Sequence, residues 1–170
     1  MHRTRTSVRS GGAAQAVPSR SARVAALKLL ALRRLTEAQL WKKLETRGYP
    51  DEQIAEAIEA CKRDGYVDDR LFASLYVEGA RKAVGDRRLI AELVKRGIDR
   101  EAAARSVEDA PLDQAARIEA AYERLMRTKS TLSYQSAART LERLGFPTSL
   151  IYRTLRLHAQ AAFGDVLTID

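Results

Sequence analysis

Three stretches of this chain repeat one pattern of leucine, glycine and apolar residues, and this repeat limits the possible folds more than any other feature. Each copy has a leucine four residues before a glycine and an apolar residue directly after that glycine. The leucines are Leu44, Leu93 and Leu141, the glycines Gly48, Gly97 and Gly145, and the residues that follow Tyr49, Ile98 and Phe146. A period of this length is typical of proteins that stack copies of one small unit.

The match extends beyond the glycines. Six residues after each glycine stand Ile54, Ala103 and Ile151, and ten residues after it stand Ile58, Val107 and Leu155. Agreement at this many offsets in three copies is not expected by chance. We therefore expect the chain to contain three copies of one unit.

Within the first copy, the residues before the glycine have the features of a helix. Thr36 can cap its start, and Gln39 stands three residues later, as in a capping box. Leu40 and Leu44 follow at helical spacing. Gly48 can adopt the positive φ that ends many helices. The pattern predicts a helix that ends in a glycine turn.

A second helix is expected after the glycine, and a third before the pair. Asp51 is expected to cap the helix after the turn, which carries Ile54, Ile58 and Cys61 on one stripe. The aromatic residues Tyr49, Tyr66 and Phe146 are expected to anchor turns. Leading helices are predicted near residues 22–34, 69–83 and 112–127. Sustained alternation of apolar and polar residues, the mark of a strand, is absent from the sequence.

The sequence therefore predicts an all-α fold of three tandem three-helix repeats that form an elongated, curved array. The expected boundaries are a disordered basic arm over residues 1–20, repeats over 21–66, 67–109 and 110–163, and a flexible C-terminal tail over 164–170.

The charge balance favours an acidic partner. The chain has 30 Lys and Arg residues against 22 Asp and Glu residues, a formal charge of +8. Arg3, Arg5, Arg9 and Arg20 lie in the first twenty residues, which hold no acid. Such an excess is typical of proteins that bind DNA, RNA or a nucleoprotein. The modest excess on the rest of the chain is also compatible with an ordinary solvated surface.

The single cysteine and the lack of a long apolar segment indicate where such a chain works. One cysteine permits no disulfide within the chain, which fits a reducing compartment. No apolar run approaches the length of a membrane span, and the N-terminus has no apolar core of a secretory signal. We expect a cytoplasmic protein that does not bind membranes.

The sequence contains no recognisable catalytic constellation. It has no phosphate-binding loop, no Cys/His/Asp set at metal-ligand spacing, and no Ser or Cys beside a histidine. We interpret Cys61 as a buried structural thiol in preference to a nucleophile. We interpret Asp68 and Asp69 as the start of a helix in preference to a catalytic carboxylate pair. We expect Trp41 to pack in the core or between modules in preference to stacking on nucleobases. We expect no enzyme activity, no metal and no cofactor.

Basic residues recur on the helix before each glycine, so a stripe along one side of the array could bind an extended acidic partner. The residues of this predicted basic stripe are Lys42, Lys43, Arg47, Arg81, Lys82, Arg87, Arg88, Lys95, Arg96, Arg139 and Arg143. The alternative is an ordinary solvated face, partly neutralised by Glu45, Glu92 and Glu142. Charge alone does not separate these two interpretations.

The centre of the chain resembles the RecX family of RecA regulators. Residues 65–77, GYVDDRLFASLYV, are similar to its signature of glycine, aromatic, aliphatic and paired aspartates, followed by Phe-Ala and an aromatic-Val pair. Residues 85–98, GDRRLIAELVKRGI, resemble the motif that follows it, and residues 25–44 the family's opening helices. The motif residues of the three copies are Gly48, Gly65, Tyr66, Asp68, Asp69, Phe72, Gly85, Gly97 and Gly145.

The resemblance implies a fold of three-helix repeats and a function in recombination, DNA repair and the SOS response. It implies binding to RecA and to its filament on single-stranded DNA, which lowers ATP hydrolysis, strand exchange and co-protease activity. No cofactor is implied, a monomer is expected, and weak direct binding to DNA stays open. The alternative is a basic helical DNA-binding module without a specific RecA partner.

Overall fold

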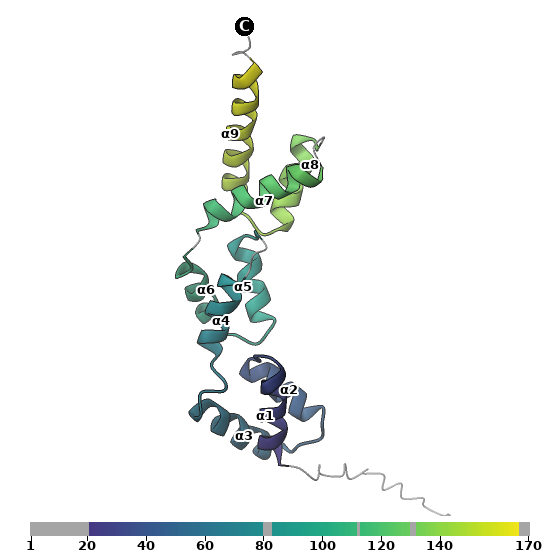
Figure 1. The fold of residues 1–170 in the computed structure, drawn as a ribbon, viewed down its shortest axis with the longest axis vertical. Helices are drawn as coiled ribbons and strands as arrows, with labels where there is room; N and C mark the ends of the chain where they lie inside the picture. Colours follow the sequence, from purple (N-terminus) through teal and green to yellow (C-terminus); the bar gives the residue numbers. More distant parts are fainter. Residues whose placement is uncertain (1–20, 80–82, 112, 130–131, 167–170) are drawn as a thin grey trace, which may run out of the picture.

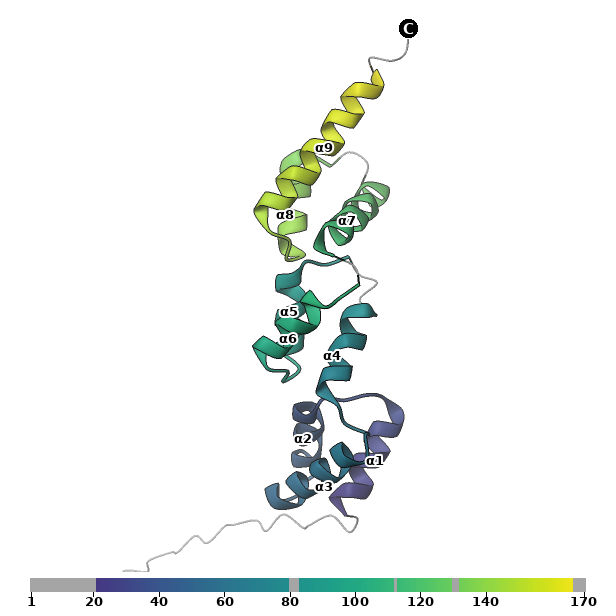
Figure 2. The same ribbon diagram turned by 90° about the vertical axis from the view of Figure 1, so that its left-hand side faces the viewer.

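The computed structural model describes residues 21–79, 83–111, 113–129 and 132–166, and within these ranges the chain forms helices and no strands. The helices are α1 (Ala22–Leu32), α2 (Glu37–Glu45), α3 (Asp51–Arg63), α4 (Asp69–Glu78), α5 (Asp86–Val94), α6 (Arg100–Glu108), α7 (Gln114–Thr128), α8 (Tyr134–Arg143) and α9 (Thr148–Val166). They follow one another in groups of three along an elongated, gently bent array (Figures 1 and 2). The predicted all-α repeat fold is confirmed.

Each group of three helices, called here module 1 (α1–α3), module 2 (α4–α6) and module 3 (α7–α9), has its own apolar core. The largest fully buried side chains include Leu40 and Ile54 in module 1, Leu93 in module 2 and Phe146 in module 3. In the described part of the chain, the extensive helix–helix packing joins helices of the same module. The modules are therefore separate packing units that meet over small joints.

The capping box predicted for the first module and the glycine turns of all three modules are present in the structure. The Thr36 hydroxyl accepts from the Gln39 backbone N–H at 3.2 Å, and the Gln39 side chain accepts from the Thr36 N–H at 3.4 Å. This is the capping box expected from the sequence. The turn glycines have positive φ angles of 80° at Gly48, 89° at Gly97 and 91° at Gly145. Asp68 also caps α4, because its carboxylate accepts from the Leu71 N–H at 2.9 Å.

Two local expectations were wrong. Asp51 does not cap α3: Pro50 occupies the cap position without a side-chain hydrogen bond, and Asp51 is the first helical residue. There its charge still complements the positive end of the helix dipole. Tyr66 does not anchor its turn, since it is 57% exposed, whereas Tyr49 and Phe146 are buried. The neighbouring Val67 is buried in the module 1 core in its place, so the chain turns the apolar side chain inward at this point.

The ends of the leading and last helices differ from the predicted ranges. Helix α1 ends at Leu32, because the chain must turn before the cap of α2. Helix α4 ends at Glu78, with Gly79 in the cap position. Helix α9 continues to Val166, three residues past the predicted end of the third repeat at 163. The predicted arm over residues 1–20 and the last residues of the predicted tail, 167–170, lie outside the described residues.

Candidate interaction surfaces

A small polar joint holds module 2 against the start of α2. The buried Thr36 hydroxyl donates to the Arg96 carbonyl oxygen at 2.5 Å, and the Glu37 N–H donates to the Asp69 carboxylate at 2.9 Å. Gly97 lies so close to α2 that a Cβ added to it would be 2.1 Å from the Cβ of Ala38. Gly97 therefore serves both the turn after α5 and the contact between modules.

The joint between modules 2 and 3 uses equivalent positions. The Gly85 N–H donates to the Leu144 carbonyl oxygen at 2.8 Å, and the Asp86 N–H donates to the Gln114 side-chain oxygen at 3.1 Å. A Cβ on Gly85 would lie 2.2 Å from the backbone of Gly145. At both joints the first residue of the leading helix, Asp69 or Gln114, thus binds the start of the preceding module's second helix.

These joints stack α2, α5 and α8 head to tail along one side of the array (Figures 1 and 2). The carbonyl oxygens of Arg96, after α5, and Leu144, after α8, accept hydrogen bonds from Thr36 and Gly85, the residues directly before α2 and α5. The negative end of one helix dipole thus faces the positive end of the next. We call these three helices the column; it is the face on which the predicted basic stripe would lie.

The second joint also contains an ion pair for which the first has no counterpart. The Arg117 guanidinium, at the start of α7, pairs with the Asp86 carboxylate, at the start of α5. Arg117 is only 8% exposed, and its Nη1 has no hydrogen-bond partner among the described residues. At the first joint the equivalent residues are Phe72 and Glu37. Removing Asp86 would leave the buried Arg117 charge unpaired at this joint, which is costly.

The structure places the described members of the predicted basic stripe on the column or on the turns that end its helices. Those within helices are Lys42, Lys43, Arg87, Arg88, Arg139 and Arg143; those at helix ends and turns are Arg47, Lys95 and Arg96. Arg81 and Lys82 lie outside the described residues. The predicted stripe would therefore follow equivalent helices but not equivalent residues: for example, Ala91 stands in α5 where Lys42 stands in α2.

Two of these cations in module 2 are engaged within the fold. Arg88 pairs with Glu92 at 3.0 Å, and Arg96 lies 4.3 Å from the ring centroid of Tyr76. The Tyr76 hydroxyl donates to Glu92, and this hydrogen bond, followed by that of Arg88, holds the pKa of Glu92 below its ordinary value. The expected neutralisation by Glu92 is thus present at one point of the column.

Other cations on the column remain available for a partner. Among the described residues, Arg47 donates one hydrogen bond to the Lys43 carbonyl oxygen, and Arg143 donates one long hydrogen bond to the Thr140 hydroxyl. Within the described ranges, no ion pair is found for Lys42, Lys43, Arg87, Lys95 and Arg139. Arg87, Lys95 and Arg139 are exposed, and they come from two neighbouring modules.

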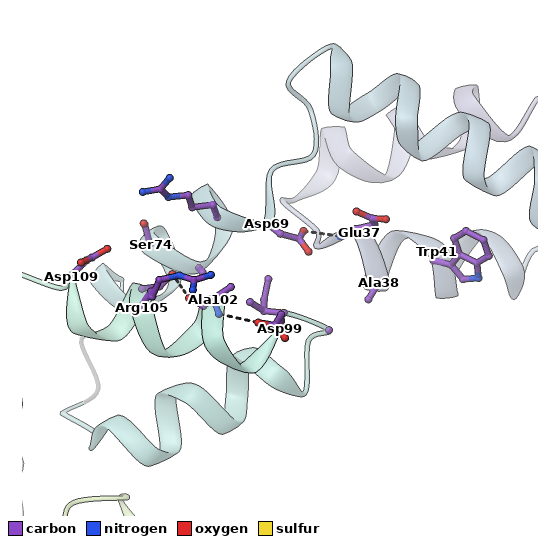
Figure 3. Close-up of a pocket in the computed structure, with 14 residues that line it drawn as sticks. Glu37, Ala38, Trp41, Asp69, Ser74, Asp99, Ala102, Arg105 and Asp109 are labelled. Carbon is purple, nitrogen blue, oxygen red and sulfur yellow. Dashed lines mark hydrogen bonds between the residues drawn. The ribbon is translucent and has the colours of Figure 1, made fainter.

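Sequence reasoning missed a hollow of about 840 Å³ beside the first joint. Its walls come from three helices of two modules: Glu37 and Trp41 of α2, Asp69 and Ser74 of α4, and Asp99, Arg105 and Asp109 along α6 (Figure 3). Desolvation raises the pKa of Asp69 above its ordinary value, against the opposing effect of the Glu37 N–H. Of these acids, only Asp69 was considered from the sequence, as part of a helix start, and the sequence contained no signal that they would share one hollow.

The groups considered for chemistry lie apart. Cys61 is fully buried in the module 1 core, as predicted, and burial raises the pKa of its thiol, with a smaller opposing effect of Arg23. Trp41 packs partly against the same core, as expected. The described residues include no group of three or more His, Cys, Asp or Glu side chains placed to hold a metal ion. Nor do they include a helix long and apolar enough to span a membrane.

Comparisons with known proteins agree on one family. A model described as "RecX, first three-helix domain" matches residues 22–61. Regulatory protein RecX of Pseudomonas entomophila is 31% identical over 134 residues, 76% of this chain and 86% of the relative. That of one Thermus thermophilus strain is 31% identical over 139 residues, 82% of this chain and 93% of the relative.

Other relatives match over a shorter range. Regulatory protein RecX of Caldanaerobacter subterraneus is 37% identical over 86 residues, and the match spans 44% of its length. With this and two mycolicibacterial relatives, the chain matches about half of the relative's length. A crystal structure of RecX from Lactobacillus salivarius superposes with a TM-score of 0.71 over 82% of this chain and 95% of that chain, at 22% identity. This last likeness establishes the fold.

Proposed function

Since this chain belongs to the RecX family, we propose that it is a regulator that binds RecA and the RecA filament on single-stranded DNA. Binding lowers ATP hydrolysis, strand exchange and co-protease activity in recombination, DNA repair and the SOS response. The protein acts in the cytoplasm as a monomer and needs no cofactor. The observation that carries this proposal is the match along 86% and 93% of two proteins named Regulatory protein RecX.

The shape and charge of the array support the same proposal. A filament presents the same surface repeatedly along its length, and an elongated array can contact it at successive points. The column offers exposed cations from neighbouring modules, among them Arg87, Lys95 and Arg139. These cations would lie against the acidic groups of a nucleoprotein, and such complementarity raises association rates and selects the partner.

The proposal is tested by RecA ATP hydrolysis on single-stranded DNA while this protein is titrated in. We expect turnover to fall as the protein approaches and exceeds the concentration of filament sites. A RecA-independent ATPase that needs single-stranded DNA serves as the control for simple removal of the DNA. Unchanged RecA turnover at a several-fold excess of the protein contradicts the proposal.

A second candidate is a helical module that binds DNA without recognising RecA. The formal charge of +8 and the four arginines in the first twenty residues favour it. Binding dominated by phosphates weakens steeply with salt. Measured over a salt series, equal affinity for naked and RecA-coated single-stranded DNA would favour this candidate, whereas a large preference for the coated DNA favours a RecA regulator.

A further inference from the structure

The hollow beside the first joint is acidic in a protein that is basic overall. Its lining contains four carboxylates, from Glu37, Asp69, Asp99 and Asp109, and two guanidinium groups, from Arg70 and Arg105. Arg105 is paired with Glu101 at 2.7 Å, and Glu37 with Lys62 at 3.1 Å. Asp99 and Asp109 are exposed at the two ends of α6, so they remain accessible to a cationic ligand.

The walls of the hollow suit an extended segment that carries arginines. Trp41 stands at one end and Asp109 at the other, with Asp69 and Asp99 between them (Figure 3). Small side chains line the floor, namely Ala38, Ala73, Ser74, Ala102 and Ser106. The half-buried indole can stack with a guanidinium group, which carboxylates can also bind. Arginine suits both the indole and the carboxylates better than lysine does, because its planar guanidinium group can stack on a ring and can donate two parallel hydrogen bonds to one carboxylate.

This chain contains a segment of matching chemistry. Residues 1–20 hold Arg3, Arg5, Arg9 and Arg20 and no acid. They join the described chain at Ser21, whose side chain caps α1. The closely spaced Arg3, Arg5 and Arg9 stand at the end farther from that attachment point.

The arm is long enough to place these arginines in the hollow. Helix α1 has 11 residues, which span roughly 16 Å. The four residues 33–36 that lead to Glu37 add at most about 14 Å. Ser21 therefore lies within roughly 30 Å of the edge of the hollow, and an extended chain of residues 10–20 covers up to about 36 Å. Residues 1–9 remain to lie along the hollow.

We propose that the arm of residues 1–20 folds back into the hollow between modules 1 and 2 and binds it through Arg3, Arg5 and Arg9. The inference does not depend on the proposed RecA function, because it concerns two parts of this chain alone.

Trp41 is the only tryptophan of the chain, so its fluorescence reports on the hollow. The full chain is compared with the variant Arg3→Gln/Arg5→Gln/Arg9→Gln by quenching with neutral acrylamide. We expect the quenching constant to rise about twofold in the variant, since exposed cation–π and ion-pair contacts are individually weak. At about 0.5 M NaCl, where charges are screened beyond a few ångströms, the two proteins should converge. Equal quenching at low salt overturns the proposal.

A second pair of variants tests the hollow itself. Asp99→Asn/Asp109→Asn removes two accessible carboxylates, and asparagine retains the capping ability of residue 99. It should raise quenching as the arm variant does, and the combined variant should show no further increase. The matched control Glu56→Gln/Glu123→Gln removes two exposed carboxylates elsewhere and should behave as the unsubstituted chain. If the three arginine substitutions raise the quenching constant as much in the Asp99→Asn/Asp109→Asn background as in the unsubstituted chain, the arm binds elsewhere and the proposal is refuted.

Dilution separates the chain's own arm from that of a second copy. Binding within one chain is independent of protein concentration, so the difference between the full chain and the arm variant should be constant over a hundredfold dilution. A difference that disappears on dilution shows an arm supplied by another molecule and overturns the proposal as stated. Circular dichroism should show the same helicity for all variants.

Discussion

The Thr36 hydroxyl donates a 2.5 Å hydrogen bond to the carbonyl oxygen of Arg96, sixty residues further along the chain. The hydroxyl oxygen of Thr36 also accepts a hydrogen bond from the Gln39 N–H and so caps α2. Thr36 is fully buried. One side chain therefore both starts a helix in module 1 and attaches module 2 to it, so the local fold and the assembly of the array depend on the same group.

Replacing Thr36 with valine keeps the shape of the side chain and removes the hydroxyl. The Gln39 N–H and the Arg96 carbonyl oxygen both lose their partner, and an unsatisfied buried group costs about 1–3 kcal/mol. We expect the free energy of unfolding to fall by about 2 kcal/mol in urea denaturation. Thr36→Ser, which keeps the hydroxyl, should retain most of the stability. If the valine variant is as stable as the unsubstituted protein, the joint contributes nothing.

Gly97→Ala tests the close approach at the same joint. It adds the strain of an L residue at φ 89° and a clash with Ala38, whose Cβ would lie 2.1 Å away. Gly65→Ala is the matched control, because its φ is 76° but nothing lies within 4 Å of the added Cβ. The control should cost about 1 kcal/mol, and Gly97→Ala more. Thermal denaturation of both variants gives the difference.

The excess cost at Gly97 should be relieved in part by Ala38→Gly in the same chain, because that change removes the atom that clashes. A double-mutant cycle measures this coupling. Absence of coupling would mean that Gly97 and Ala38 do not lie in contact as described.

Charge reversal of Arg87 and Lys95 tests the column as the surface that binds the filament. Both are exposed and without an ion pair among the described residues. Arg87→Glu/Lys95→Glu should weaken binding to RecA-coated single-stranded DNA about tenfold or more, because attraction becomes repulsion at two points. Binding is measured by fluorescence anisotropy of labelled protein at fixed salt, with helicity checked by circular dichroism.

The control for this experiment reverses two exposed cations off the column, Arg63 in α3 and Arg124 in α7, and so keeps the net charge change equal. If both double variants lose affinity to the same degree, total charge rather than the column governs binding.

Cys61 makes stability depend on pH above neutrality. Burial raises the pKa of its thiol above the ordinary value of 9.0. The folded state therefore keeps the proton at a pH at which the unfolded chain begins to lose it. The contribution of this group is fully present below about pH 9 and is lost as pH rises further. Urea denaturation from pH 7 to 10 should show the decline.

Comparison with Cys61→Ala isolates the contribution of the thiol. Burial also raises the pKa of Tyr76, but Tyr76 is present in both the unsubstituted protein and the variant, so its contribution cancels in the comparison. The substituted protein should be less stable at pH 7, since it leaves a small cavity, but its decline between pH 8 and 10 should be shallower. Parallel curves for the two proteins would contradict the assignment. In the folded protein, alkylation of the thiol by iodoacetamide should be slow.

Capping and turn signals were readable because they act over three or four residues. Thr36 with Gln39 and the positive-φ glycines are such cases, and both are confirmed. Asp51 was predicted to be an N-cap and Tyr66 a turn anchor from residue type and position alone, and both predictions were wrong. For α3, Pro50 occupies the cap position before Asp51. At the other turn, Val67 and not Tyr66 is buried in the module 1 core.

By itself, the sequence determined the all-α class, the three repeated units and the apolar positions of each core. These properties follow from spacing along the chain, which a helix converts directly into a face. Tertiary structure alone decided how the units join. Thr36 meets Arg96, Gly85 meets Leu144, and Asp69, Asp99 and Asp109 share a hollow with Trp41. Such contacts depend on the relative placement of whole modules, which no local pattern encodes.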